Sequence, residues 1–210
     1  MSNPFTPDPD LAAKIASGSG RIESIEHQER TLWVKRPEKL HGKLRLYKGD
    51  PAKAFRAEQE AVQRFADKGL PIAPLVAVGD GFIAFEDAGE PLKNLLRFED
   101  HTLEERIAMM EGAATALAAF HASGISHGRP NLKDILWQNG KARFIDFERA
   151  SRARDTAKGH AEDVILFFFS AFAELDNSSV EIEAARKAYI AAGGAAFWDL
   201  AVARMARFKW

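Results

Sequence analysis

Residues 127–149 decide the fold of this chain, and they read HGRPNLKDILWQNGKARFIDFER. Residues 135–137 are apolar, residues 142–145 are apolar except for Arg143, and both runs have the length of short strands. Asn139 and Gly140 stand between these runs, and Asn-Gly is the strongest short signal for a hairpin turn. The segment therefore predicts a polar loop, then a hairpin, and then Asp146 at the end of an apolar strand.

Helical patterns flank this segment on both sides. Thr102 and Glu105 have the spacing of a capping box, and the helix that they start should end near Gly124. Ser178 and Glu181 repeat this spacing farther along the chain. Beyond the hairpin, helices are predicted at about 161–175 and 180–192, and an amphipathic stretch covers 197–210. The second half of the chain is therefore mainly helical.

The first half combines strands with one helix. Asp50 is a good N-cap, Pro51 suits the first helical position, and Gly69 is a C-terminal stop, so a helix is predicted between them. Runs rich in β-formers predict one hairpin from 21–26 and 31–35 and a second from 75–78 and 82–85. Strands with one helix, followed by a helical half, indicate an α+β fold.

Composition excludes several classes of protein. The 210 residues are 46% hydrophobic, which is enough for a core, and the net charge of −1 gives no reason to expect nucleic-acid binding. Cysteine is absent, which excludes disulfides, thiolate catalysis and Cys-ligated zinc. The N-terminus lacks the pattern of a signal peptide, and the longest apolar run is far shorter than the roughly 20 residues of a bilayer span. We therefore expect a cytoplasmic protein.

The segment 127–149 resembles the catalytic core of protein kinases, in which H-R-D-x-x-x-x-N and D-F-G bracket two short strands. His127 matches the loop histidine, Asp134 the metal-binding asparagine, and Asp146 the aspartate of D-F-G. Only sixteen residues separate Asp146 from Asp163, so a full activation segment has no room. In this the chain resembles small bacterial kinases, namely the lipopolysaccharide kinases that act on Kdo or core heptose, and the RIO-like group. The resemblance covers about residues 35–175.

The resemblance implies a minimal two-lobed protein-kinase-like fold. Residues 1–10, which are Pro-rich, would be a mobile N-terminus, and 11–87 would be an N-lobe with a small antiparallel sheet and one helix. Residues 88–210 would be a helical C-lobe with reduced C-terminal helices. The implied cofactors are ATP with Mg²⁺ or Mn²⁺. The implied acceptor is a hydroxyl, on a lipopolysaccharide core sugar or on a protein Ser/Thr.

The chemistry of phosphoryl transfer gives the two aspartates a reason to be there. Such transfer needs cations that neutralise the phosphates, and Mg²⁺ or Mn²⁺ is held by hard oxygen ligands. Asp134 and Asp146 would supply those oxygens. Taken singly, Asp134 is as well explained as a turn residue and Asp146 as an ordinary strand-end carboxylate. Their register with His127 and the hairpin favours the metal site.

The resemblance also implies a strand lysine that binds the phosphates and a helical glutamate that orients it. Lys35 ends an apolar run as the lysine of V-A-I-K does, and Glu58 lies on the following helix. Glu60 is the competing partner, about 200° around the helix from Glu58. Lys43 and Lys48 remain alternatives to Lys35. Without the resemblance, such a pair would be interpreted as solvated surface charges.

Two further candidates concern support and phosphate binding. Gly18 and Gly20 could let backbone amides approach phosphates, although no third glycine follows at the expected spacing and a plain flexible turn explains them equally well. Asp163 is implied to hold the catalytic loop through backbone hydrogen bonds. The alternative for Asp163 is a carboxylate favoured by the dipole of a helix start.

Arg129 departs from the resemblance, because it stands where the kinases have their presumed catalytic base. In one interpretation the chain is an active kinase in which Arg129 binds phosphate or an anionic acceptor. Asp134 then either remains a metal ligand or acts as base instead. In the other interpretation the chain is a pseudokinase, a nucleotide-binding or scaffolding module without transfer activity. A third hypothesis is an unrelated α+β interaction domain.

Two basic stretches bear on partners. Arg149, Arg152, Arg154 and Lys158 follow Asp146 and could meet an anionic acceptor, although a solvated loop is the commoner use of such residues. The stretch 197–210 mixes basic with aromatic residues and could make peripheral membrane contact. A helix that covers the core is the commoner use of that pattern.

Overall fold

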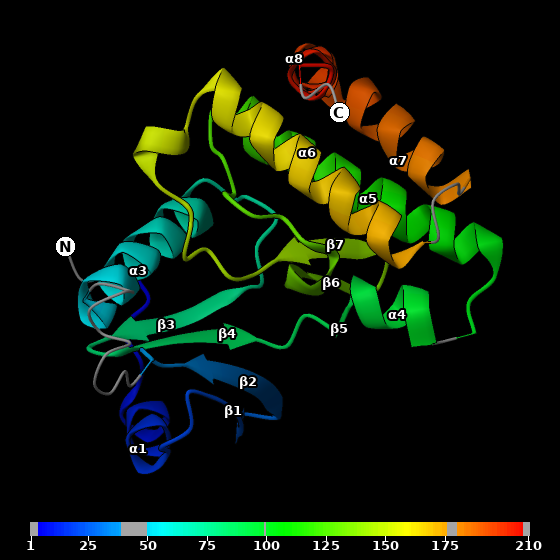
Figure 1. Ribbon diagram of the computed structural model, residues 1–210. Coiled ribbons are helices and arrows are strands. Elements are labelled where there is room, and N and C mark those ends of the chain that lie inside the picture. Colours follow the sequence, from blue (N-terminus) through cyan, green and yellow to red (C-terminus); the bar gives the residue numbers. More distant parts are fainter. Residues whose placement is uncertain (1–3, 39–49, 99, 176–179, 208–210) are drawn as a thin grey trace. The chain divides into compact units, whose positions relative to one another are not determined.

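The computed structural model describes residues 4–38, 50–98, 100–175 and 180–207. The chain divides into two compact units, Met1–Asp87 and Ala88–Trp210 (Figure 1). The first unit contains a four-stranded sheet, and the second contains a three-stranded sheet with most of the helices. The predicted α+β class is confirmed.

The sheet of the first unit consists of β1 (Ile22–His27), β2 (Arg30–Lys35), β3 (Leu75–Gly79) and β4 (Phe82–Glu86). Its order is β1-β2-β4-β3 and all its pairs are antiparallel, so both predicted hairpins are present. Gln28 and Glu29 join β1 to β2 with φ angles of 50° and 61°. A two-residue turn with both central residues in the left-handed region matches the twist of a hairpin.

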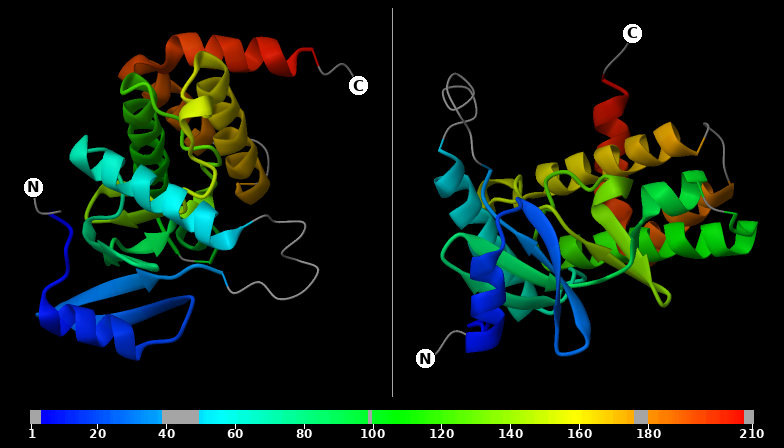
Figure 2. Two further views of the ribbon diagram at one scale, coloured as in Figure 1. Left: turned by 90° about the vertical axis from the view of Figure 1, so that its left-hand side faces the viewer. Right: turned by 90° about the horizontal axis from the view of Figure 1, so that it is seen from below.

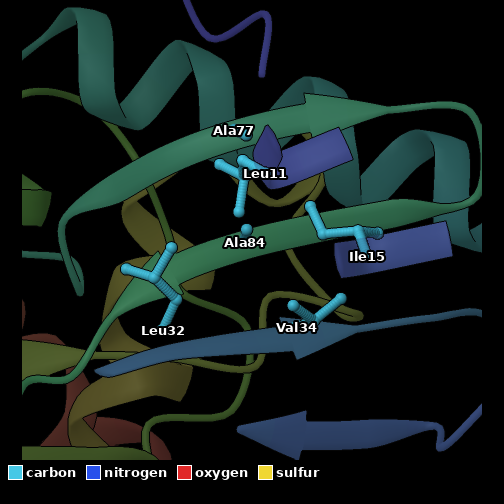
Figure 3. Close-up of a cluster of buried hydrophobic side chains, with 6 residues drawn as sticks. All are labelled: Leu11, Ile15, Leu32, Val34, Ala77 and Ala84. Carbon is cyan, nitrogen blue, oxygen red and sulfur yellow. The ribbon is translucent and has the colours of Figure 1, made fainter. Parts of the chain in front are cut away.

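Helix α1 (Pro9–Ser17) was not predicted from the sequence, which indicated only a mobile, Pro-rich start up to residue 10. The helix begins early because Asp8 caps it, accepting a hydrogen bond of 2.9 Å from the N–H of Leu11, and because Pro9 suits its first turn. Leu11 and Ile15, one helical turn apart, are buried against the sheet. Their cluster also contains Leu32, Val34, Ala77 and Ala84 (Figure 3).

Helix α3 (Pro51–Asp67) follows the predicted boundaries closely. Asp50 accepts a hydrogen bond of 3.0 Å from the N–H of Ala52, and the helix gives way to Gly69, which has φ of 64°. The side-chain amide of Gln59 donates to the carbonyl oxygens of Gly79 and Phe82 at 2.7 and 3.0 Å. These bonds fix the helix against the β3–β4 hairpin and thereby set the direction in which the residues near Gln59 point.

The sheet of the second unit is formed by β5 (Glu90–Pro91), β6 (Ile135–Gln138) and β7 (Lys141–Phe144), in that order. Asn139 and Gly140 form the predicted turn between β6 and β7, with φ angles of 50° and 74°. A short 3₁₀ helix, η1 (Leu132–Asp134), leads directly into β6. The hairpin therefore places the residue before β6 and the residues after β7 at the same end of the sheet.

The helices of the second unit are α4 (Leu92–Phe98), α5 (Leu103–Ala122), the 3₁₀ turn η2 (Arg152–Arg154), α6 (Ala157–Glu174), α7 (Val180–Tyr189), a π-helical segment η3 (Ile190–Gly194) and α8 (Ala195–Met205). The capping box of Thr102 and Glu105 is confirmed. Helix α6 begins about one turn earlier than predicted, because Thr156 caps it. The predicted cap at Ser178 lies outside the described residues.

Helices α5 and α7 pack along each other, and α5 also contacts β7. Helix α8 packs on α6 and crosses it, as the left view of Figure 2 shows. The ring of Phe120 on α5 packs against the rings of Phe144 and Phe147, and its centroid lies 5.3 and 6.1 Å from theirs. This aromatic core anchors the hairpin to the helices. Within the described ranges, no helix combines the length and apolar character needed to cross a membrane.

Candidate active site

The polar loop before η1 is held by one buried carboxylate. Asp163, on α6, is fully buried and accepts hydrogen bonds from the N–H groups of His127 and Gly128 at 2.6 and 2.9 Å. Gly128 has φ of 95°, and a side chain there would meet the carbonyl oxygen of Arg149 at 2.5 Å. The loop can therefore take this path only with glycine at position 128.

His127 links this loop to the strand end that carries Asp146. Its Nδ1 accepts a hydrogen bond of 3.3 Å from the N–H of Arg129, so its Nε2 carries the proton and donates to the carbonyl oxygen of Ile145 at 3.2 Å. The ring packs on Phe144 and Phe147, with centroids 5.0 and 4.9 Å apart. Burial lowers the pKa of His127 to about 4, so the ring is neutral and acts as a spacer.

The hairpin brings Asp134 and Asp146 to the same place. Ile135 pairs with Phe144, and the N–H of Ile145 donates to the carbonyl oxygen of Asp134 at 3.0 Å. Asp134 therefore lies across from the residue that precedes Asp146. Asp146 has φ of 64°, a strained region that aspartate tolerates better than most residues. The backbone turns sharply there and sends Phe147 into the core.

Asp134 carries an unpaired oxygen in a buried position. The residue is 5% exposed, and its Oδ2 has no hydrogen-bond partner among the described residues. Burial raises the pKa of Asp134, Lys133 at 3.3 Å from Oδ1 opposes that rise, and the charge of Asp146 adds to it. A buried carboxylate oxygen without a partner is costly, and a cation would satisfy it.

Arg129 makes an ion pair with Asp146. Its Nη2 donates to Oδ2 of Asp146 at 2.9 Å, and the two side chains are 32% and 20% exposed. Arg129, which stands where the kinases have their presumed base, therefore pairs with Asp146, which matches the aspartate of D-F-G.

The donor set suits a hard divalent cation that takes its remaining ligands from elsewhere. Within the described ranges, no cluster of three or more His, Cys, Asp or Glu residues could hold a metal by itself. Mg²⁺ is usually bound by one or two carboxylates together with water and substrate phosphates. Asp134 and Asp146 fit that requirement, and the unpaired Oδ2 of Asp134 is the observation that supports it.

The first unit contains the predicted lysine and glutamate. Nζ of Lys35, at the end of β2, lies 2.6 Å from Oε1 of Glu58 on α3. Their side chains are 14% and 3% exposed, so the pair is shielded from water. Glu60 is exposed, so the structure brings Lys35 to Glu58 instead. Lys43 and Lys48, the alternatives for the lysine, lie outside the described residues.

The structure does not leave the amides of Gly18 and Gly20 open to an anion. The N–H of Gly18 donates to the carbonyl oxygen of Ile15 at 3.3 Å, and that of Gly20 donates to Oε2 of Glu23 at 3.1 Å. Glu23 is in turn paired with Arg36 at 2.6 Å. A carboxylate already stands where a phosphate would have to bind, so the structure favours a structural turn here.

Comparison with known proteins agrees with this geometry. Residues 18–189 match the sequence model of the lipopolysaccharide kinase (Kdo/WaaP) family. The chain belongs to this family. An uncharacterized protein of Haemophilus influenzae is 30% identical over 190 residues, which are 90% of this chain and 78% of that protein.

A solved structure is similar to this chain in fold. The crystal structure of aminoglycoside-3′-phosphotransferase of type VIII has a TM-score of 0.59 and 14% sequence identity, and the match covers 90% of this chain and 92% of that one. The kinase-like fold implied by the sequence resemblance is confirmed. Together with the family, it makes this chain a kinase-like phosphotransferase.

This member of the Kdo/WaaP family also has a buried polar network that the sequence did not reveal. Tyr189 Oη lies 2.6 Å from Nδ1 of His121, whose Nε2 lies 3.4 Å from Oδ2 of Asp163. Since Asp163 can only accept, His121 donates to it and accepts from Tyr189. Burial raises the pKa of Tyr189, so it stays a donor. These hydrogen bonds hold the carboxylate of Asp163 in place, and Asp163 in turn holds the loop.

A second branch of this network reaches the segment before α6. The hydroxyl of Ser126 donates to the carbonyl oxygen of Arg154 at 2.6 Å, so Nδ1 of His160, 2.8 Å away, donates to that hydroxyl. The rings of His121 and His160 stack with centroids 4.6 Å apart. Burial, with the nearby His121, lowers the pKa of His160 to about 4. The sequence offered one signal of this network, the histidine at position 121 in the mostly apolar helix α5. Its partners could not be inferred, because they lie far away in sequence.

Proposed function

We propose that this chain transfers the γ-phosphoryl group of ATP to a hydroxyl group, with Mg²⁺ or Mn²⁺ held by Asp134 and Asp146. The observation that carries the proposal is the buried, unpaired Oδ2 of Asp134 beside the carboxylate of Asp146. The bound cation would neutralise charge on the phosphates.

The chain's own residues take the following roles in the proposal. Lys35 binds the phosphates of ATP, and Glu58 holds its ammonium group in place at 2.6 Å. His127 and Asp163 keep the loop in shape through contacts with backbone atoms. None of these residues needs to react, because phosphoryl transfer depends mostly on positioning and charge stabilisation.

In the reaction, the acceptor hydroxyl oxygen forms a bond to the γ-phosphorus while the bond from that phosphorus to the bridging oxygen of ADP breaks. The hydroxyl proton must leave. Arg129 cannot accept it, since a guanidinium stays protonated at physiological pH. Asp134 is assigned to the metal, so the proton passes to solvent, and a loose transition state does not require a side chain to accept it.

The acceptor that we favour is a sugar hydroxyl of lipopolysaccharide. The family description supports this choice over a protein Ser/Thr. Arg149, Arg152 and Lys158 are exposed in the segment after Asp146 and provide positive charge for an acceptor that carries phosphate or carboxylate.

A pseudokinase is the second candidate. The observation that favours it is the ion pair between Arg129 and Asp146, which places a fixed positive charge on the expected metal ligand. In that case the chain would bind a nucleotide, or serve as a scaffold, without transferring phosphate.

One experiment separates these candidates. Melting temperatures would be measured with ATP, with and without Mg²⁺ or Mn²⁺, for wild type, Asp146→Ala and the exposed control Asp199→Ala. Transfer of radiolabel from [γ-³²P]ATP to lipopolysaccharide or to the chain itself would be followed in parallel. A metal-dependent rise that Asp146→Ala alone abolishes, with label transfer, supports the kinase. A rise without transfer supports the pseudokinase, and no rise at millimolar ATP contradicts both nucleotide-binding proposals.

A further inference from the structure

The guanidinium of Arg129 places a positive charge beside the carboxylate to which the proposed metal ion would bind. Its guanidinium donates to Oδ2 of Asp146 at 2.9 Å, and its positive charge also lowers the pKa of Asp134. It therefore acts on both carboxylates of the proposed metal site. Oδ2 of Asp134 nevertheless keeps no hydrogen-bond partner among the described residues.

The backbone from which this guanidinium extends is anchored in the loop. The N–H of Arg129 donates to Nδ1 of His127, and its carbonyl oxygen accepts from the N–H of Asn131 at 2.9 Å. Pro130, with its fixed φ, follows directly. Arg129 thus starts from an anchored backbone, and only its side chain is free to move.

We propose that Arg129 is an internal competitor of the metal ion: it occupies Asp146 when the metal is absent, and metal binding at Asp146 requires the ion pair to open. The inference rests on the metal site of the proposed function. The released guanidinium then carries a positive charge that binds an anionic group, either a phosphate of the nucleotide or the acceptor. In this way the same residue keeps the site closed to metal and joins it once substrates arrive.

The size of the effect follows from the charges. A guanidinium held about 5 Å from a divalent ion opposes its binding even when water screens both charges, by a factor of about ten in affinity. Partial burial reduces that screening, so ten is a lower estimate. Removing the guanidinium should therefore tighten metal binding at least about tenfold.

The test is the affinity of the purified full chain for Mn²⁺, read from the electron paramagnetic resonance signal of free Mn²⁺. Wild type, Arg129→Gln, Arg129→Ala and Arg129→Gln with Asp146→Asn would be titrated, and circular dichroism would confirm that each is folded. Glutamine keeps much of the length of the side chain, so it covers the case in which alanine disturbs the loop. Lys141→Ala is the matched control, because it also removes one positive charge, from an exposed position on the β6–β7 hairpin.

The proposal expects Arg129→Gln and Arg129→Ala to bind Mn²⁺ at least about tenfold more tightly than wild type. Lys141→Ala should match wild type, and the double variant should lose the gain. Equal affinity in wild type and both Arg129 variants would overturn the competition but leave the proposed metal site standing. Absence of Mn²⁺ binding in every variant, with and without ATP, would overturn the metal site itself and the inference with it.

Discussion

Replacing Asp163 with asparagine should destabilise the protein strongly, although the two side chains have nearly the same shape. Asp163 is fully buried and accepts from the N–H groups of His127 and Gly128 and from the ring of His121. Asparagine has one acceptor oxygen, so its NH₂ group must face a donor in either orientation.

The magnitude follows from the bonds that are lost. One buried backbone N–H is left unpaired, at a cost of about 1–3 kcal/mol, and the remaining bond loses the assistance of the negative charge. We therefore expect Asp163→Asn to lower the free energy of unfolding by roughly 2–4 kcal/mol. With a urea m-value of about 2 kcal/mol/M, the unfolding midpoint should fall by about 1–2 M.

The assay combines urea unfolding with amide hydrogen exchange at positions 127 and 128. Asp199→Asn is the matched control, since Asp199 is exposed on α8, and its free energy of unfolding should stay within about 0.5 kcal/mol of wild type. Exchange at His127 and Gly128 should accelerate only in Asp163→Asn. The reasoning is refuted if both variants unfold at the same urea concentration and both amides keep their protection.

Three further predictions concern the other buried polar groups. Lys35→Met leaves the buried carboxylate of Glu58 without this cation and should lower the free energy of unfolding in urea by roughly 3 kcal/mol. Adding Glu58→Gln should recover much of that loss, and a double variant no more stable than the single one would contradict the prediction. Tyr189→Phe removes the donor to His121 and should cost about 1 kcal/mol, and it should also speed exchange of the Gly128 amide, which a purely local packing effect would leave unchanged. Asp134→Asn should raise the urea midpoint at neutral pH, because the raised pKa of Asp134 means that its charged form destabilises the folded state. Protonation of Asp134 removes that destabilisation as pH falls, so the difference in midpoint between variant and wild type should shrink toward acid pH. A difference that stays constant with pH would contradict the prediction.

Sequence patterns predicted those features that depend on neighbouring residues. The Asn139-Gly140 turn, the capping box at Thr102 and the helix after Asp50 were all correct, because each is decided within a few residues. Helix α1 was missed, since its Pro-rich start resembles a tail. The burial of Leu11 and Ile15 against strands far along the chain stabilises it.

The support of the site could not be predicted because its contacts are remote in sequence. His121 meets Tyr189 across 68 positions and Asp163 across 42. No periodic pattern in the sequence identifies partners that far apart. Asp163 itself was identified only through the family resemblance. The choice of Glu58 over Glu60 likewise depended on the direction in which α3 is fixed, partly by the amide of Gln59.

The contacts that hold the loop in shape are independent of the side chain at position 129. The loop is held by backbone N–H groups on Asp163 and by the ring of His127, and none of these contacts uses the side chain of residue 129. A carboxylate or a guanidinium can therefore stand there without changing the path of the chain. With arginine, the position offers positive charge and no proton acceptor. An arginine at this position is compatible with transfer, because a loose phosphoryl transition state depends more on positioning and charge stabilisation than on a base.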